Sequence, residues 1–273
     1  MRMGARIGLF LMVLSLFSCF NPKKDSTLLR AASGNFAAQL SAVMRNAELP
    51  AALSEKIGAA AARPAFMTGL SACLKGDPYL RALVDKQHAL PPGYVPSDLV
   101  TLTEGPYRVN RAGLLLRRAA AESLAEMAAE ARKSGVILVA SSTYRSYDYQ
   151  VEVYSRHVRE MGQEAADRES ARPGHSQHQT GLVVDFGSID DSFAQTAAGR
   201  WMAANASRFG WSLSFPDGYE AVTGYRWESW HYRYVGKELA AFIDAYFDGI
   251  QQYALRFIYE WELYTMKAGS FEL

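Results

Sequence analysis

Two short clusters of histidine and acidic side chains are the part of this 273-residue sequence best suited to carry chemistry. The first cluster contains His178 and Asp185, and the second contains Glu228 and His231. Asp185 lies in an apolar run, residues 181–186, that has the pattern of a buried strand. A carboxylate in such a run is costly to bury unless a positive partner meets it, and a metal ion is such a partner.

Together the two clusters could form a catalytic zinc centre, which needs three protein ligands and one open position. His178, Asp185 and His231 supply two neutral imidazoles and a carboxylate, and Glu228 is left as the base for the attacking water. Glu228 and His231 would point to opposite faces of a flat strand. We therefore predict that His231 lies in a strand and that Glu228 lies just before it. The alternative is that the two clusters are unrelated and that the polar groups of each are hydrogen-bonded separately within a core.

The spacing around these residues resembles that of a known peptidase family. Residues 176–185, SQHQTGLVVD, resemble the motif S-x-H-x-x-G-x-A-x-D, and residues 228–231, ESWH, resemble E-x-W-H. These are the signatures of the VanY-type D-alanyl-D-alanine carboxypeptidases, within the lysostaphin/D-Ala-D-Ala/hedgehog group of zinc peptidases. Val183 stands where the family usually has alanine. Because this residue is neither a metal ligand nor the catalytic acid, the difference affects local packing only. The likeness covers about residues 79–245 and includes the Tyr-Arg-Ser-Tyr segment at 144–147.

The resemblance implies a role for each site residue. Arg145 matches the family arginine that meets the substrate carboxylate or the developing oxyanion, and a guanidinium suits either anion. Gln150 and Ser176 are weaker candidates for holding the terminal D-residue, since either could simply cap a turn. The implied zinc ligands are His178, Asp185 and His231, with Glu228 as the catalytic base.

The elements expected around the site alternate between strands and helices, which predicts an α+β domain over one sheet. Helices are expected at about 110–134, with Asn110 as the cap, and at 147–161, 194–209 and 236–247. Strands are expected at 136–142, 181–186, 211–215 and 227–234. The resemblance implies an antiparallel sheet with flanking helices around a central zinc site, as in hedgehog/D-Ala-D-Ala peptidases, and a helical N-terminal region precedes it.

The first 19 residues have the features of an export signal. Arg2 and Arg6 precede an apolar stretch, residues 7–17, that is shorter than a typical membrane-spanning helix. The stretch leads into Leu-Phe-Ser-Cys, which resembles the lipobox of bacterial lipoproteins and predicts lipidation of Cys19. A plain secretory signal or an uncleaved anchor is the alternative. Every interpretation predicts export, and we expect a membrane-anchored lipoprotein of the cell envelope that faces the periplasm or cell wall.

Composition limits the class of protein. Hydrophobic residues make up 49% of the chain and charged residues 21%, which excludes a wholly disordered chain. A formal net charge of +1 argues against a nucleic-acid binder that works through a broad basic face. Two cysteines are too few for a disulfide scaffold or a cysteine-rich zinc module.

These observations lead to one expected function and to two alternatives. We expect a signal peptide at 1–18, a helical spacer or accessory region at 19–75, a zinc carboxypeptidase domain at 76–247 and a helical tail at 248–273. The resemblance implies a zinc-dependent D,D-carboxypeptidase that removes the C-terminal D-alanine from peptidoglycan stem peptides. The alternatives are an L,D-carboxypeptidase acting on tetrapeptide stems and a non-catalytic, cell-wall-binding lipoprotein.

Overall fold

The computed structural model of this chain describes residues 36–61 and 63–267. The leader and Cys19 lie outside the described residues, so export and lipidation stay predictions. The chain divides into two units, Met1–Gln39 and Leu40–Leu273, and the second unit contains every element discussed below. The described part begins within a helix that ends at residue 46.

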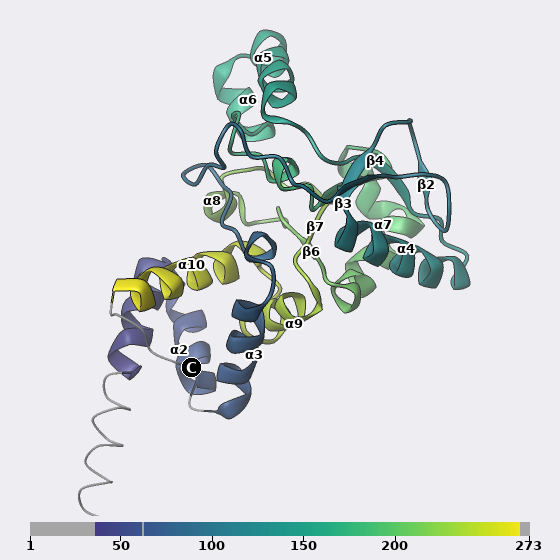
Figure 1. The fold of residues 1–273 in the computed structure, drawn as a ribbon. Helices are drawn as coiled ribbons and strands as arrows, with labels where there is room; N and C mark the ends of the chain where they lie inside the picture. The colour runs from purple at the N-terminus through teal and green to yellow at the C-terminus, as the bar shows by residue number, and fades with distance from the viewer. Residues whose placement is uncertain (1–35, 62, 268–273) are drawn as a thin grey trace, which may run out of the picture. The chain divides into compact units, whose positions relative to one another are not determined.

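A five-stranded sheet forms the centre of the second unit (Figure 1). Its spatial order is β2-β4-β5-β7-β6, with bounds Arg108–Val109 (β2), Val139–Ser142 (β4), Val183–Phe186 (β5), Trp211–Leu213 (β6) and His231–Tyr234 (β7). Strands β4, β5, β7 and β6 pair antiparallel, and β2 is a parallel edge strand. A separate antiparallel pair joins Leu99–Thr101 (β1) to Leu115–Arg117 (β3). The expected α+β fold is confirmed, and its sheet is antiparallel except at β2.

Helices surround this sheet, and one of them has the bounds that the sequence predicts. The helix bounds are Ala51–Ala61 (α2), Pro64–Lys75 (α3), Arg118–Lys133 (α4), Tyr147–Met161 (α5), Gln163–Glu169 (α6), Ala197–Asn205 (α7), Glu220–Thr223 (α8), Lys237–Tyr246 (α9) and Gln251–Lys267 (α10). Short 3₁₀ turns lie at Pro78–Leu80 (η1), Gln177–Thr180 (η2), Asp191–Gln195 (η3) and Ala206–Phe209 (η4). Helix α5 covers the predicted residues because the Ser146 hydroxyl caps it, accepting a hydrogen bond from the Tyr149 N–H.

The helix expected from Asn110 begins later, at Arg118. Asn110 does not cap it; its backbone N–H donates to the carbonyl of Ala140 in β4. In the segment that follows, Leu114 and Leu116 are buried whereas Leu115 and Arg117 are partly exposed. This alternation with a period of two belongs to a strand rather than to a helix.

All four expected strands are shorter than predicted, and one expected helix is divided. The strand expected at 227–234 begins only at His231, so Glu228 lies before it, as predicted. The helix expected at 194–209 is divided into η3, α7 and η4. The break occurs because Thr196 caps α7, its hydroxyl accepting from the Gly199 N–H, so a new helix starts there.

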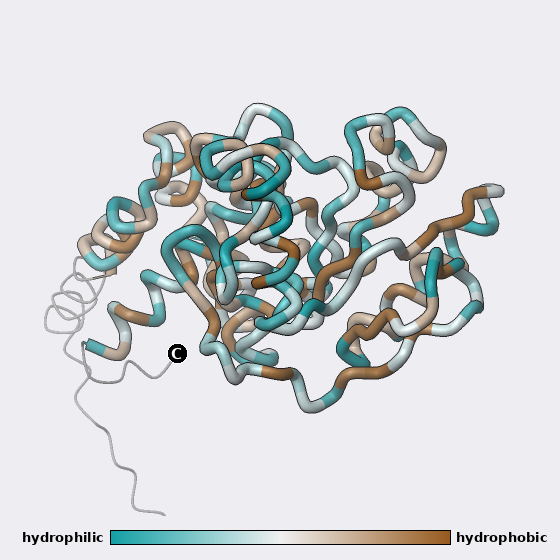
Figure 2. Tube along the Cα trace, turned by 90° about the horizontal axis from the view of Figure 1, so that it is seen from above, coloured by the Kyte–Doolittle hydropathy of each residue, from teal (hydrophilic) through white to brown (hydrophobic). Residues whose placement is uncertain are grey.

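Helices from both ends of the second unit form one aromatic-rich layer. Phe66 of α3 is fully buried and contacts Phe242 and Tyr246 of α9 and Phe257 of α10. The view in Figure 2 shows hydrophobic and hydrophilic residues alternating along peripheral helices, as amphipathic packing requires. The helices before residue 76 and after residue 247 therefore pack together, and the domain boundaries given above stay predictions.

Membrane-spanning potential among the described residues is confined to one bent helix pair. Over residues 36–61 and 63–267, no single helix is both long and apolar enough to cross a membrane. Helices α2 and α3 pass such a test only as a pair, by length and composition, and they are bent by 102° at their junction.

The thiol of Cys73 gives a prediction about reactivity. Cys73 lies on α3 at 7% exposure, and burial together with the nearby Glu238 carboxylate raises the pKa of its thiol to about 12. At pH 8 roughly one thiol in ten thousand is then ionised, against about a quarter for an ordinary cysteine. We expect alkylation of Cys73 to be roughly a thousandfold slower in the folded protein than in guanidinium, as measured by peptide mapping. Equal rates would contradict the burial of this side chain.

Candidate metal centre and active site

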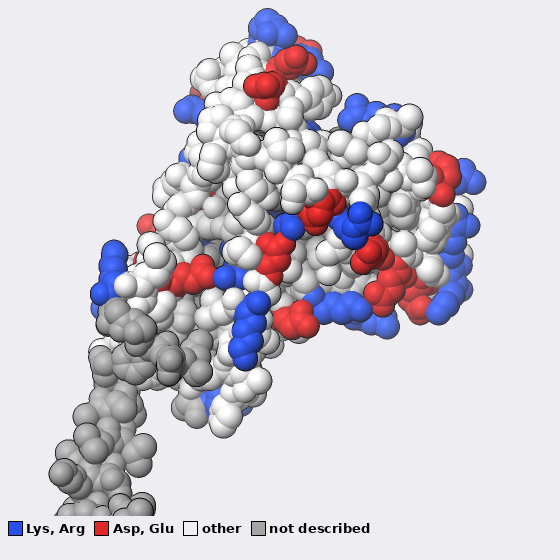
Figure 3. Space-filling view, viewed as in Figure 1, with Lys and Arg blue, Asp and Glu red and all other residues white. Residues whose placement is uncertain are grey.

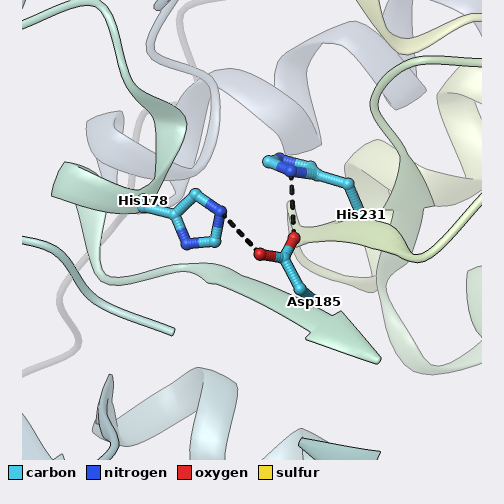
Figure 4. Close-up of side chains that lie close together, drawn as sticks. All are labelled: His178, Asp185 and His231. Atoms are coloured by element: carbon cyan, nitrogen blue, oxygen red, sulfur yellow. Dashed lines mark ion pairs between the residues drawn. The ribbon is translucent and has the colours of Figure 1, made fainter. Parts of the chain in front are cut away.

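The two sequence clusters meet on neighbouring strands of the sheet. Asp185 of β5 stands directly opposite His231 of β7 in the antiparallel register, so both side chains project from the same face. His178 comes from η2, which precedes β5. Figure 4 shows the three side chains pointing toward one another.

A glycine makes the turn between η2 and β5. Gly181 has φ +69°, a left-handed conformation that favours glycine. A Cβ at this position would lie 2.9 Å from the Arg117 side chain and 3.0 Å from that of Leu99. The glycine thus lets the chain reverse closely enough for His178 to reach Asp185.

The distances among the three side chains suit a shared metal ion. His178 Nε2 lies 3.2 Å from Asp185 Oδ2, and His231 Nδ1 lies 3.2 Å from Asp185 Oδ1. The potential ligand atoms all lie within 4.8 Å of one another, and the residues are only 1–4% exposed. Two atoms bound to one tetrahedral zinc would lie about 3.3 Å apart.

The hydrogen bonds around this trio leave ligand atoms free for a metal. His178 Nδ1 donates to the Thr143 carbonyl at 2.6 Å, which keeps the lone pair of Nε2 on the side of Asp185. Asp185 Oδ1 is buried and accepts no hydrogen bond of good geometry among the described residues, although His231 Nδ1 lies 3.2 Å away. A buried acceptor of this kind is costly unless it is satisfied. The donor set therefore fits a zinc ion held by His178, Asp185 and His231.

Burial and mutual charge set the pKa values of these groups. Burial lowers the pKa of His178 to about 4, and the Arg145 charge acts in the same direction. Burial opposes ionisation of Asp185, but the two histidines hold the pKa of its carboxyl well below its usual range. Burial also opposes protonation of His231, but Asp185 and Glu228 outweigh it and raise its pKa to about 9. The site thus favours an ionised carboxylate that faces positive charge.

Glu228 lies beside the trio, in the turn before β7. Its Oε2 is 3.2 Å from Nδ1 of His231, the same nitrogen that faces Asp185, and its side chain is 12% exposed. The backbone N–H of His231 donates to the Glu228 carbonyl, which closes the turn. Because Glu228 lies in this turn and not in the strand, it does not point to the face opposite His231. The turn therefore brings Glu228 close to the three proposed ligands.

Arg145 also reaches the trio, from the loop between β4 and α5. Its Nη2 donates to Asp185 Oδ2 at 3.0 Å and to Ser142 Oγ at 2.9 Å, and its Nη1 donates to Gln150 Oε1 at 3.4 Å. Its side chain is 19% exposed, so the guanidinium is held in place by these bonds and is still accessible from the solvent. Ser142 was missed by sequence reasoning, although it is paired with Asp185 across β4 and β5.

A cavity of about 440 Å³ opens over these groups. Its lining includes Arg145, Ser176 and Glu228, together with the three proposed ligands, His178, Asp185 and His231. Gln150 is fully buried and is not among the lining residues; its Nε2 donates to the Ala171 carbonyl at 2.7 Å. Gln150 thus joins Arg145 to residues 170–171, which line the cavity. Its direct contact with a substrate, and that of Ser176, stay predictions.

Helix α10 contacts the segment that carries His178 indirectly, through residues 212–214. The buried Gln251 donates from Nε2 to the Ser212 carbonyl, and its Oε1 lies 3.4 Å from the Ser214 hydroxyl. That hydroxyl donates to Gln177 Oε1 at 2.7 Å, next to His178. The tail, expected to be helical, therefore supports the position of η2 through residues 212–214.

This support predicts an effect of Gln251 on metal binding. Gln251→Leu removes the hydrogen bond to the Ser212 carbonyl and the polar contact with Ser214. We therefore expect zinc to dissociate up to about tenfold faster, as for other losses of groups that support metal ligands. Stopped-flow transfer of zinc to a chromophoric chelator measures this rate. Thr265→Val is the control, because the Thr265 hydroxyl bonds only within α10. Equal dissociation rates in the two variants would contradict the proposed support.

Comparison with known proteins finds carboxypeptidases among the proteins similar to this chain. The VanY family, described as D-alanyl-D-alanine carboxypeptidase, matches residues 113–237. The chain is 40% identical over 169 residues to YodJ of Bacillus subtilis (strain 168), covering 59% of this chain and 62% of that protein. It is 32% identical over 160 residues to a D-alanyl-D-alanine carboxypeptidase of Enterococcus faecium, covering 56% and 50%. The chain thus spans about half to three fifths of these curated relatives.

Solved structures extend the comparison to the fold. The LdcB LD-carboxypeptidase is 36% identical with a TM-score of 0.56, and the match covers 63% of this chain and 86% of that one. A variant of the vancomycin-resistance D,D-pentapeptidase VanY in complex with Zn(II) is 31% identical with a TM-score of 0.53, covering 63% and 96%. With its two motifs joined at one buried centre, the chain belongs to the VanY family of D-alanyl-D-alanine carboxypeptidases.

Proposed function

We propose that this protein is a zinc-dependent D,D-carboxypeptidase that removes the C-terminal D-alanine from peptidoglycan stem peptides. One observation carries the proposal. The three buried groups that could bind a metal line one cavity, and the Glu228 carboxylate lies in the same cavity, beside Nδ1 of His231. The Zn(II) complex of a VanY relative supports zinc as the metal. The D-alanyl-D-alanine carboxypeptidases among the relatives support the substrate class.

The proposed mechanism assigns a separate task to each polar group. Zinc, when bound, would polarise the attacking water and the scissile carbonyl. Glu228 would take the proton of that water and return it to the leaving amine. Arg145 would bind the terminal carboxylate of the peptide and align the scissile bond, because Ser142, Gln150 and Asp185 already fix its guanidinium. The cavity would hold the peptide against these groups.

The second candidate is an L,D-carboxypeptidase that acts on tetrapeptide stems. The similarity to LdcB, at 36% identity, favours this candidate. Both activities use the same metal ligands and base, so the shape of the cavity around the terminal residues decides between them.

Digestion of defined stems separates these functions. The zinc-loaded protein is incubated with pentapeptide and tetrapeptide stems, and the products are weighed by mass spectrometry. Our proposal predicts loss of one alanine residue from the pentapeptide and an unchanged tetrapeptide. Loss from the tetrapeptide alone would make the protein an L,D-carboxypeptidase. A zinc-free protein that binds stems without cleaving them would support the non-catalytic, cell-wall-binding alternative.

We also propose that the protein is exported and anchored to a membrane by a lipid on Cys19. The basic and apolar leader and the Leu-Phe-Ser-Cys sequence support this proposal, and a substrate outside the cytoplasmic membrane agrees with it. Expression of the full chain and of Cys19→Ala in bacteria fed a labelled fatty acid tests it. We expect the label in the membrane-bound full chain alone; label in neither protein would contradict lipidation.

A further inference from the structure

The cavity over the metal centre carries more positive charge than the proposed chemistry uses. Its acidic lining residues all have basic partners: Glu169 pairs with Arg226 at 2.9 Å, Asp185 with Arg145, and Glu228 with His231. Among the residues that the structure describes, no acidic group of the lining therefore remains to neutralise a further cation.

Two lining arginines have no such partner. Arg111 and Arg156 are exposed, and neither makes an ion pair or a side-chain hydrogen bond with any residue in the described ranges, 36–61 and 63–267. Arg111 lies in the loop between β2 and β3, and Arg156 lies on α5. The two arginines thus reach the cavity from separate elements, and Figure 3 shows a recess between the lobe of α5 and α6 and the part of the surface that carries β2.

The number of arginines matches a substrate with two separate anionic groups. In the proposed reaction Arg145 takes the terminal carboxylate, and it is the guanidinium bonded to Asp185. Arg111 and Arg156 would then be free for an anion elsewhere on the same peptide. A guanidinium binds a carboxylate through two parallel hydrogen bonds, so an unpaired arginine on a cavity wall is suited to this task.

The size of the cavity allows a peptide longer than the reacting pair of residues. Its volume of about 440 Å³ lies within the range of pockets that enclose drug-sized ligands. Exposed apolar side chains on its lining, Tyr149, Met161 and Ile189, offer contact to the non-polar parts of such a peptide. A substrate that fills the cavity would therefore extend from the metal centre toward its walls.

We propose that Arg111 and Arg156 form a binding site for a second carboxylate of the peptide substrate, on a side chain upstream of the scissile bond. The preferred substrates are then peptides whose internal residue is a diamino acid with a free carboxylate, rather than a diamino acid without one. This inference rests on the proposed function, because it takes the peptide substrate and the place of its terminal carboxylate from that proposal.

Two stem pentapeptides that differ only in the third residue test the proposal. One carries lysine and the other meso-diaminopimelate, which adds one carboxylate to the same side chain. Dissociation constants are measured by calorimetry with zinc-loaded Glu228→Ala protein, so that the peptides are not consumed, and turnover is measured separately with the wild type. We expect about tenfold tighter binding of the diaminopimelate stem at low salt, and a smaller ratio in high salt because the arginines are exposed.

Substitution of the arginines identifies the source of the preference. In the Arg111→Gln, Arg156→Gln double variant, on the same Glu228→Ala background, we expect the two stems to bind equally, with the lysine stem bound as before. Arg159→Gln is the matched control, since Arg159 is also an exposed arginine of α5 but does not line the cavity. This control should keep the tenfold ratio.

The outcomes separate this inference from the proposed function. Equal binding of the two stems by the parent protein, or a preference that survives the double substitution, would overturn the inference. An equal loss for both stems in the double variant would also overturn it, because the arginines would then bind a group common to both. A stem preference without cleavage by the wild type would support the inference while contradicting the carboxypeptidase activity.

Discussion

Glu228→Ala is expected to lower the turnover of stem pentapeptide by about 10²–10⁴-fold, the usual contribution of a positioned general base. The loss follows from the position of Glu228, whose Oε2 lies 3.2 Å from the His231 nitrogen that faces Asp185. Among the described residues of the lining, the other two carboxylates are Asp185, a proposed ligand, and Glu169, which is paired with Arg226. Steady-state release of D-alanine measures the effect.

Zinc content distinguishes the loss of a base from the loss of the metal. Glu228 is not one of the three proposed ligands, so elemental analysis should find one zinc per chain in Glu228→Ala. Glu228→Gln keeps the shape of the side chain but cannot accept the proton, and it should be as inactive as the alanine variant. Activity like that of the wild type in either zinc-loaded variant would contradict the assignment of the base.

His178→Ala is expected to remove the metal itself. Loss of one of three ligands should weaken zinc binding by more than about 100-fold, since loss of a mere supporting group already costs 10–100-fold. Turnover should fall with the zinc content. The fold should persist, because Asp185 keeps Arg145 and His231 as neighbours. Elemental analysis after dialysis and circular dichroism measure the two effects.

A neighbouring histidine provides the control for this variant. His175 also lines the cavity, but its Nδ1 donates to the Asp85 carbonyl at 2.7 Å and it does not belong to the trio. His175→Ala should therefore keep one zinc per chain. Equal zinc loss in His175→Ala and His178→Ala would show that disturbance of the loop, rather than removal of a ligand, causes the effect.

The gathering of His178, Asp185 and His231 was predictable from the sequence because their surroundings make each of them costly to bury alone. An aspartate inside an apolar run and a histidine after a glutamate are costly to bury without a common partner. Strand alternation gives the face on which Asp185 lies, and the turn required by Glu228 follows from the same rule. The helix over residues 147–161 was predictable for a similar reason, since Ser146 marks its first turn.

Other features depend on contacts that no short segment reveals. Strands β2 and β3 contain two and three residues, too few for a periodic signal, and they are defined by pairing with β4 and β1. Gln251 and Gln252 are polar residues, yet both are buried. Gln252 bonds to Asp85, and that partner is 167 residues away in the chain.

The most direct test of the central claim is the digestion of a stem pentapeptide with and without a metal chelator. Our account predicts that the zinc-loaded protein releases one alanine residue, that protein stripped by the chelator releases none, and that added zinc restores the activity. Cleavage that continues at an unchanged rate in the stripped protein, after elemental analysis has shown it free of metal, would contradict the account.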